Sequence, residues 1–234
     1  MPVALAILAL AVLSLSCARV LPWSKEPIGS EVNLAFTLDH NLVRLNTVRI
    51  DGHTGHFLLG TAAPRTIVDA KFPLRTFYAH AIQYGERETV RIDPAITDLG
   101  GVADAIIGAE AWSRHAITID YRVGLVSYQK EGIKSGGMYV YNFPNEPMIN
   151  VIVDGKETPA IVDTTSPDTI VLPGGGARGT ANVRVADVDF GTIDIAYQNV
   201  HQARVGNRVL SRFLVTIDYG RKVVGLWRDP RTAP

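Results

Sequence analysis

The chain has one cysteine among its 234 residues, Cys17, and the sequence contains no cysteine–histidine spacing typical of zinc sites. It also lacks a G-x-x-x-x-G-K phosphate-binding loop. Lys plus Arg equals Asp plus Glu at 23 each, without the basic excess that nucleic-acid-binding proteins usually carry. We therefore expect no disulfide framework, no metal, no cofactor and no nucleic-acid partner.

Long amphipathic helical patterns are missing as well, whereas short runs of β-forming residues recur along the chain. Hydrophobic residues make up 47% and charged residues 20%, which is typical of a folded globular protein. Runs such as VNLAFTL and ITIDY are separated by turn residues, and Asp-Gly at 51–52 and again at 154–155 is a strong hairpin signal. The pattern predicts an all-β fold.

The N-terminus carries an apolar run, VALAILALAVLSLSCA at residues 3–18, which is short for a membrane span and ends in small residues. We interpret residues 1–18 as a signal peptide or a lipoprotein signal with Cys17 as the lipidated residue. An uncleaved membrane anchor is the alternative. The sequence thus predicts an exported protein, which is periplasmic, secreted or lipid-anchored at Cys17.

The chain repeats itself. DGHTGHFLLGTAAPRTIV (residues 51–68) and DGKETPAIVDTTSPDTIV (residues 154–171) are identical at seven of eighteen positions without a gap. GAEAWSRHAITIDY (108–121) and GNRVLSRFLVTIDY (206–219) form a second matching pair. Such duplication predicts two homologous lobes, at residues 31–130 and 137–230, joined by EGIKSGG.

Each lobe has a strand, a DG hairpin, an apolar strand ending in a loop, another apolar strand, then IIG or RVG, a short helix and TIDY. This order resembles the retropepsin-like and pepsin-like aspartic peptidases. The resemblance covers about 200 residues. It implies two barrel-like lobes related by a pseudo-two-fold axis, each contributing one catalytic Asp from a loop of the form hydrophobic-hydrophobic-Asp-Thr/Ser-Gly.

The resemblance assigns roles to the two loops. Asp163 takes the place of the catalytic Asp in the second lobe, and Thr61 and Thr164 take the places of the threonines that lock the loops together. Gly60 stands where the first catalytic Asp is expected, and Ala62 and Thr165 replace the glycine that follows. Two carboxyl groups that share a proton are needed to activate water and polarise the peptide carbonyl. Half of this dyad is therefore missing.

Three function hypotheses remain open from the sequence. The first is a non-catalytic or very weak member that binds extended peptide in the cleft between the lobes. The second is an active aspartic endopeptidase that uses Asp163 with a second carboxylate from another chain or position. The third is a structural or interaction protein of the cell envelope.

Some other candidates carry weaker signals. Tyr84-Gly85 resembles the flap hairpin of pepsin-like enzymes, although an ordinary hairpin turn is favoured. A metal site formed by Asp51, His53 and His56 is disfavoured because three ligands rarely converge within so short a turn. Asp120 and Asp218, which occur in both TIDY copies, are expected to be structural.

Overall fold

The computed structural model describes residues 32–75, 79–85, 88–112, 115–129 and 137–228. In these ranges twenty strands form, together with two helices of three and four residues. The predicted all-β class is confirmed. Residues 1–18 with Cys17, and most of the 131–137 connection, lie outside the described residues. Within the described ranges, no helix has the length and apolar character that crossing a membrane requires.

Each half of the chain supplies strands and one short helix. The N-terminal half (residues 32–129) contains β1 (Val32–Asp39), β2 (Leu42–Leu45), β3 (Val48–Ile50), β4 (Phe57–Leu59), β5 (Ile67–Asp69), β6 (His80–Tyr84), β7 (Glu88–Ile92), β8 (Ala95–Thr97), β9 (Ala105–Ile107), the 3-10 helix η1 (Ala109–Ala111), β10 (Ala116–Asp120) and β11 (Leu125–Gln129). The C-terminal half (residues 137–228) contains β12 (Tyr139–Asn142), β13 (Met148–Val153), β14 (Lys156–Val162), β15 (Ile170–Pro173), β16 (Arg178–Val185), β17 (Val188–Gln198), β18 (Ala203–Val205), α1 (Asn207–Leu210), β19 (Leu214–Asp218) and β20 (Val223–Trp227).

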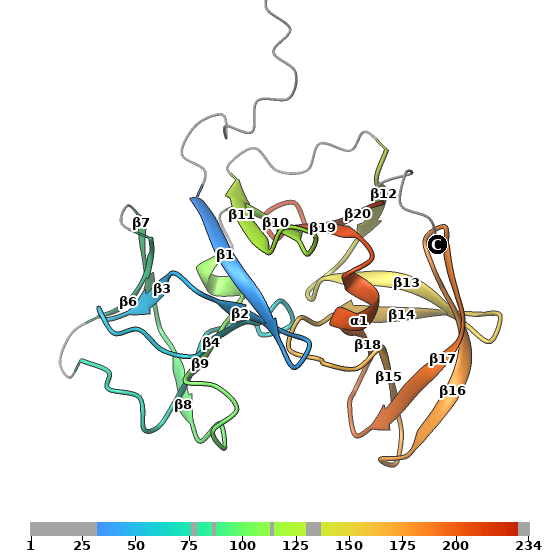
Figure 1. Cartoon of the computed structure of the whole chain (residues 1–234), viewed down its shortest axis with the longest axis horizontal. Helices are drawn as coiled ribbons and strands as arrows, with labels where there is room; N and C mark the ends of the chain where they lie inside the picture. Colours follow the sequence, from blue (N-terminus) through green and yellow to red (C-terminus); the bar gives the residue numbers. More distant parts are fainter. Residues whose placement is uncertain (1–31, 76–78, 86–87, 113–114, 130–136, 229–234) are drawn as a thin grey trace, which may run out of the picture.

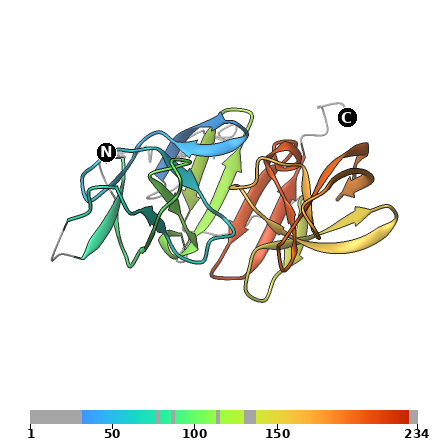
Figure 2. The ribbon, with the colours of Figure 1, turned by 90° about the horizontal axis from the view of Figure 1, so that it is seen from below.

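One continuous sheet joins the two halves. Six of its eleven strands run in the order β12-β20-β19-β10-β11-β1, with three strands from each half. At its centre β10 and β19 pair antiparallel, and Thr118 lies opposite Thr216. Figure 1 shows these six strands across the top of the molecule, and Figure 2 shows the two halves side by side along the long axis.

The two halves also share a pattern of strand pairing beyond these six strands. In the N-terminal half β4 pairs with β9 in parallel, β9 with β5 antiparallel, and β5 with β8 in parallel. In the C-terminal half β14, β18, β15 and β17 pair in the same order and with the same directions. The loops after β4 and β14 therefore begin from equivalent positions in the two halves.

Among the described strands, a closed barrel forms only in the C-terminal half, from β13, β14, β18, β15, β17 and β16. It closes because β13 pairs with both β14 and β16. The matching stretch of the N-terminal half is interrupted by a bend at residues 46–47, and β7 is separated from β8 by Asp93-Pro94. Proline has no N–H for the strand ladder. The expected first barrel is instead divided between the large sheet and the three-stranded sheet β3-β6-β7.

Along β1, β2 and β16, buried and exposed residues alternate, and the buried residues pack in the core. The two Asp-Gly turns form as the sequence predicts. Asp51 and Asp154 have φ of 51° and 48°, and Gly52 and Gly155 have φ of 87° and 78°. Positive φ at both turn residues is the geometry that Asp-Gly favours in tight hairpins.

Candidate functional site

The candidate site consists of the loops that follow β4 and β14. The first loop begins at Gly60, whose N–H donates to the carbonyl of Ile107 at 2.9 Å. The second begins at Asp163, whose N–H donates to the carbonyl of Val205 at 3.0 Å. Both loops are thus attached in the same way to the strand that precedes the short helix of their own half.

Thr61 and Thr164 bind the two loops to each other. The N–H of each threonine donates to the Oγ1 of the other, and both distances are 3.1 Å. The Thr61 hydroxyl donates to the carbonyl of Val162 at 2.6 Å, and the Thr164 hydroxyl donates to the carbonyl of Leu59 at 2.5 Å. Both side chains are buried. We call this reciprocal set the threonine bridge; it fixes the two loops across a local two-fold arrangement.

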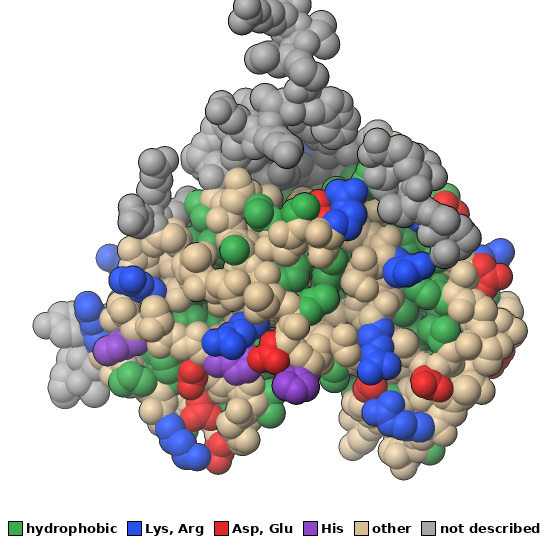
Figure 3. Space-filling model, in the orientation of Figure 1, with side chains coloured by type: hydrophobic (Ala, Val, Ile, Leu, Met, Phe, Trp, Pro, Cys, Tyr) green, Lys and Arg blue, Asp and Glu red, His purple; other side chains and the backbone are tan. Residues whose placement is uncertain are grey.

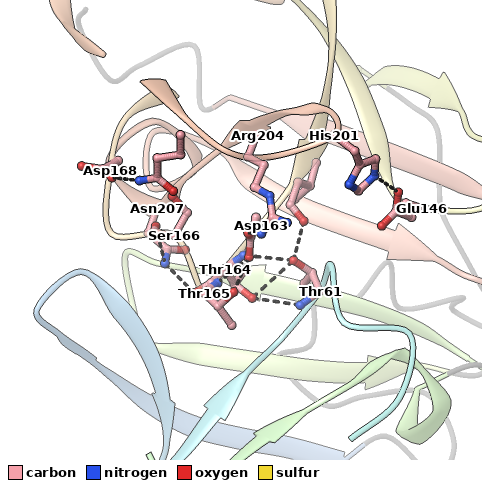
Figure 4. A network of polar contacts seen from close by, with 12 residues as sticks. Thr61, Glu146, Asp163, Thr164, Thr165, Ser166, Asp168, His201, Arg204 and Asn207 are labelled. Carbon is pink, nitrogen blue, oxygen red and sulfur yellow. Dashed lines mark hydrogen bonds and ion pairs between the residues drawn. The ribbon is translucent and has the colours of Figure 1, made fainter. Parts of the chain in front are cut away.

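Asp163 lies directly before the bridge and is 1% exposed. Figure 4 shows its carboxylate between Thr165 and Arg204. One oxygen accepts from the N–H of Thr165 at 2.9 Å and from its hydroxyl at 2.5 Å, and the other accepts from Arg204 Nη1 at 2.6 Å. Among the described residues, no second acid is hydrogen-bonded to Asp163. The carboxylate is therefore neutralised by a guanidinium group.

Arg204 reaches Asp163 from β18, which runs parallel to β14. Its side chain is 31% exposed, so it forms one wall of the site and its outer part faces solvent. Its Nε is buried without a hydrogen-bond partner in the described chain. An unpartnered buried donor costs free energy, and the charge-assisted bond to Asp163 offsets that cost.

The equivalent position in the N-terminal half holds no charge. Ile106 occupies the middle of β9, as Arg204 occupies the middle of β18. A Cβ added to Gly60 would lie 2.4 Å from Ile106 Cγ2, closer than real Cβ contacts occur. The neighbour that fills the space beside Gly60 is therefore Ile106.

Buried polar side chains also connect the halves around the bridge. The Asn207 amide donates to the carbonyls of Asn41 and Thr164 at 2.6 and 2.7 Å and accepts from the Tyr121 hydroxyl at 2.8 Å. The Tyr219 hydroxyl donates to the carbonyl of Thr61 at 3.0 Å. Burial raises the pKa of both tyrosines far above its ordinary value, so both phenols stay protonated and remain donors.

Tyr84 and Gly85 lie elsewhere. They end β6, and Figure 1 places β6 and β7 at the edge of the molecule farthest from β14, β15 and β18. Tyr84 is 1% exposed, and its ring stacks on Trp112 with a centroid separation of 4.9 Å. The alternation of β6 turns this side chain inward. Tyr84 therefore packs in the core, and β6 pairs antiparallel with β7, as in the ordinary hairpin that the sequence favoured. Gly85 has φ of 56°, as a hairpin turn requires.

Asp51, His53 and His56, which the sequence analysis considered as a metal site, contact different neighbours. Asp51 pairs with His80 at 2.8 Å, the His53 ring packs against Phe72, and His56 Nε2 lies 3.4 Å from Asp39 without a hydrogen bond. The described residues contain no group of three or more His, Cys, Asp or Glu side chains that could hold a metal ion. Asp120 and Asp218 accept backbone N–H groups at the ends of β10 and β19.

Sequence reasoning did not find Arg204, Ile106 or Asn207. One signal was available, because aligning the two copies places Arg204 of ARVG opposite Ile106 of AIIG, an arginine within an apolar strand. A charged residue at such a position requires a partner. For Asn207 the copies show alanine against asparagine, which by itself does not point to a site.

Comparison with known proteins gives no further assignment: no protein-family model matches the chain, and no curated protein matches it.

Proposed function

We propose that this chain is an aspartic-peptidase-like protein that does not hydrolyse peptide bonds and that binds extended peptide between its two halves. The observation that carries the proposal is the threonine bridge, which holds together a loop with a buried Asp163 and a loop with Gly60. Two loops joined by equivalent threonines are what the family resemblance implies, and this supports the proposal, while Gly60 supplies no second acid.

The contacts of Asp163 support the loss of catalysis. A shared-proton dyad needs two carboxyl groups at hydrogen-bond distance, because neither then ionises independently of the other. Asp163 instead forms a 2.6 Å ion pair with Arg204, and Gly60 has no group that can hold a proton. A carboxylate whose oxygens accept from Arg204 and Thr165 is poorly placed to take a proton from water.

The surface supports peptide binding. Figure 3 shows the molecule hollowed at its lower edge between the two halves, and in the same view of Figure 1 this hollow lies between the β1–β2 hairpin and β15. Arg204 is partly exposed and uses only Nη1 for Asp163, so in this proposal its other terminal nitrogen, Nη2, donates to a peptide carbonyl. Because the Asp163–Arg204 pair has no net charge, it favours the binding of an uncharged peptide backbone over the binding of a free anion.

Two assays test the proposal. With an unstructured, fluorescence-quenched casein as substrate between pH 3 and 7, we expect no cleavage above that of Asp163→Asn. With a labelled library of unstructured decapeptides, we expect saturable binding that Arg204→Met weakens about tenfold, in line with one lost charge-assisted bond. Arg178→Met is the matched control, since Arg178 is 72% exposed and pairs with Asp168 at 3.2 Å.

The outcomes separate the rival functions. Cleavage that Asp163→Asn abolishes would establish an active endopeptidase, and sedimentation would then show whether a second chain supplies the missing acid. Absence of both cleavage and peptide binding would contradict the proposal and favour a structural or interaction protein.

The exported location stays a prediction. Determining the N-terminal residue of the protein purified from its cells, and the mass of any lipid on Cys17, tests it directly.

A further inference from the structure

A second polar feature lies in the N-terminal half, away from the threonine bridge. A pocket of about 450 Å³ opens over the three-stranded sheet β3-β6-β7. Its lining comes from the Asp51-Gly52 turn, from Arg75 and Ala79 after β5, and from β6 and β7. Small-molecule sites typically have volumes of about 300–1,000 Å³.

The strand register explains why one wall is polar. Gln83 lies opposite Thr89, and Ala81 lies opposite Arg91. Paired residues of neighbouring strands share a face of the sheet. Ile82 and Tyr84, which alternate with them along β6, are buried on the other face. Arg49 of β3 lies opposite Gln83 and therefore belongs to the same polar face.

The floor of the pocket is a satisfied carboxylate. Asp51 is 7% exposed and accepts from the N–H groups of Arg75 and Ala81 at 3.1 and 3.0 Å and from His80 Nδ1 at 2.8 Å. Its oxygens are therefore committed to the turn and to the neighbouring strand. Asp51 fixes the backbone of Arg75 and does not pair with an arginine side chain.

In contrast to Asp51, the arginine side chains of this face lack partners among the described residues. Within the described parts of the chain, no hydrogen bond or ion pair is formed by the side chains of Arg49, Arg75 or Arg91. The Arg75 guanidinium lies over the turn, 3.5 Å from the position that a Cβ on Gly52 would take. Figure 3 shows Lys and Arg side chains gathered at the left edge of the molecule, over this sheet. The pocket therefore carries a positive field.

The C-terminal half shows that the fold does not require these arginines. Asp154 occupies the equivalent turn and accepts the N–H of Asn182 at 2.9 Å, as Asp51 accepts the N–H of Ala81. At Asn182 the opposing residue of β17 is Thr192, where β7 has Arg91. The turn and its carboxylate are thus common to both halves, whereas the arginine opposite the turn is found only in the N-terminal half.

We propose that this pocket binds a small ligand carrying at least two oxyanion groups, through Arg75 and Arg91 with Gln83 and Thr89 as additional donors. Planar guanidinium groups match the paired oxygens of phosphate and carboxylate groups. More than one arginine at the pocket favours a ligand with more than one anionic group. This site is independent of the peptide-binding proposal.

Isothermal titration calorimetry at low salt, with pyrophosphate and citrate as separate probes, tests the site and distinguishes its two chemistries. We expect saturable one-to-one binding of at least one probe, weakened by added salt because screening reduces the attraction. Arg75→Gln and Arg91→Gln should each weaken that binding about tenfold, the effect of losing one charge-assisted contact. Arg184→Gln is the control, because Arg184 lies on β16, the strand of the C-terminal half that corresponds to β6.

Binding of pyrophosphate alone would assign the site to phosphate-bearing ligands, and binding of citrate alone would assign it to polycarboxylates. The proposal is overturned if neither probe binds at millimolar concentration, or if the two substitutions at the pocket change the affinity no more than the control does. Urea denaturation of each variant shows whether it is folded, and these surface substitutions are expected to leave the midpoint unchanged.

Discussion

Thr118 and Thr216 contact each other through their hydroxyl groups, with an Oγ1–Oγ1 distance of 2.9 Å across the β10–β19 pair. They occupy the same position in the two TIDY copies. Thr61 and Thr164 are likewise equivalent residues in contact, with an Oγ1–Oγ1 distance of 3.3 Å. Equivalent residues of the two halves thus contact each other at two places, one in the sheet and one at the candidate site.

The threonine bridge should be a major contributor to stability. Thr61→Val or Thr164→Val removes one hydroxyl and leaves a buried N–H and a buried carbonyl without a partner, so each should lower the free energy of unfolding by about 2 kcal/mol. The double variant should lose less than the sum, because the bonds are shared. Urea denaturation measures all three, and Thr180→Val on the exposed face of β16 is the control. Additive losses would show that the two threonines act independently.

Removing one partner of the Asp163–Arg204 pair should destabilise the fold more than replacing both partners by apolar residues. Arg204→Met leaves a buried carboxylate without its cation and should lower the free energy of unfolding by about 3 kcal/mol. Asp163→Leu combined with Arg204→Met should recover part of that loss, because an apolar pair needs no charge compensation. Thermal or urea unfolding tests this, with Arg178→Met expected to cost under about 1 kcal/mol as an exposed pair. A double variant less stable than Arg204→Met would contradict this account.

An acid introduced at position 60 should give cleavage activity only if space is also made for its side chain. Gly60→Asp alone should destabilise the protein by about 1–3 kcal/mol, because its Cβ would overlap Ile106 Cγ2. Adding Ile106→Ala removes the clash, and adding Arg204→Leu frees Asp163 from its guanidinium partner. We expect cleavage of the quenched casein only in this triple variant. Activity in Gly60→Asp alone would show that neither Ile106 nor Arg204 blocks the chemistry.

Gly206, the glycine of RVG, should not tolerate a side chain. A Cβ at this position would lie 2.1 Å from the carbonyl oxygen of Asp168, which is backbone and cannot rotate away. Gly206→Ala should therefore cost about 3 kcal/mol or prevent folding. Gly175→Ala is the control, because a Cβ there meets no atom within 4 Å. Soluble yield and the urea midpoint measure the effect, and equal midpoints for the two variants would argue against the close approach.

The Asp51 network should make stability depend on pH. Burial alone would raise the pKa of Asp51, but hydrogen bonds from His80, Ala81 and Arg75 lower it below its ordinary value of 3.8. A carboxyl with a lowered folded-state pKa stabilises the fold above its unfolded pKa, and this contribution is lost as the pH falls through the folded-state pKa. The stability difference between the protein and Asp51→Asn should therefore be largest at pH 7 and should shrink below about pH 4. A stability difference that does not change between pH 7 and pH 3 would contradict this role for Asp51.

Local chemistry in the sequence predicted much of the fold. Alternating β-formers and Asp-Gly turns act over a few residues, so they correctly indicated an all-β protein, the two tight turns and a short helical turn after IIG and RVG. The family resemblance also assigned Thr61, Thr164 and Asp163 to one site, and the structure places the loops that carry them side by side.

What only the tertiary structure decided depends on contacts between distant residues. The pairing of Arg204 with Asp163 joins positions 41 residues apart and requires the parallel register of β14 and β18. The fit of Ile106 against Gly60 and the burial of Tyr84 on Trp112 depend equally on how strands pack, which a local pattern does not encode. By itself the sequence determined that glycine stands at position 60 where the second copy has Asp163. The fold decided that Asp163 is paired with a cation and that the space beside Gly60 is filled by an apolar side chain.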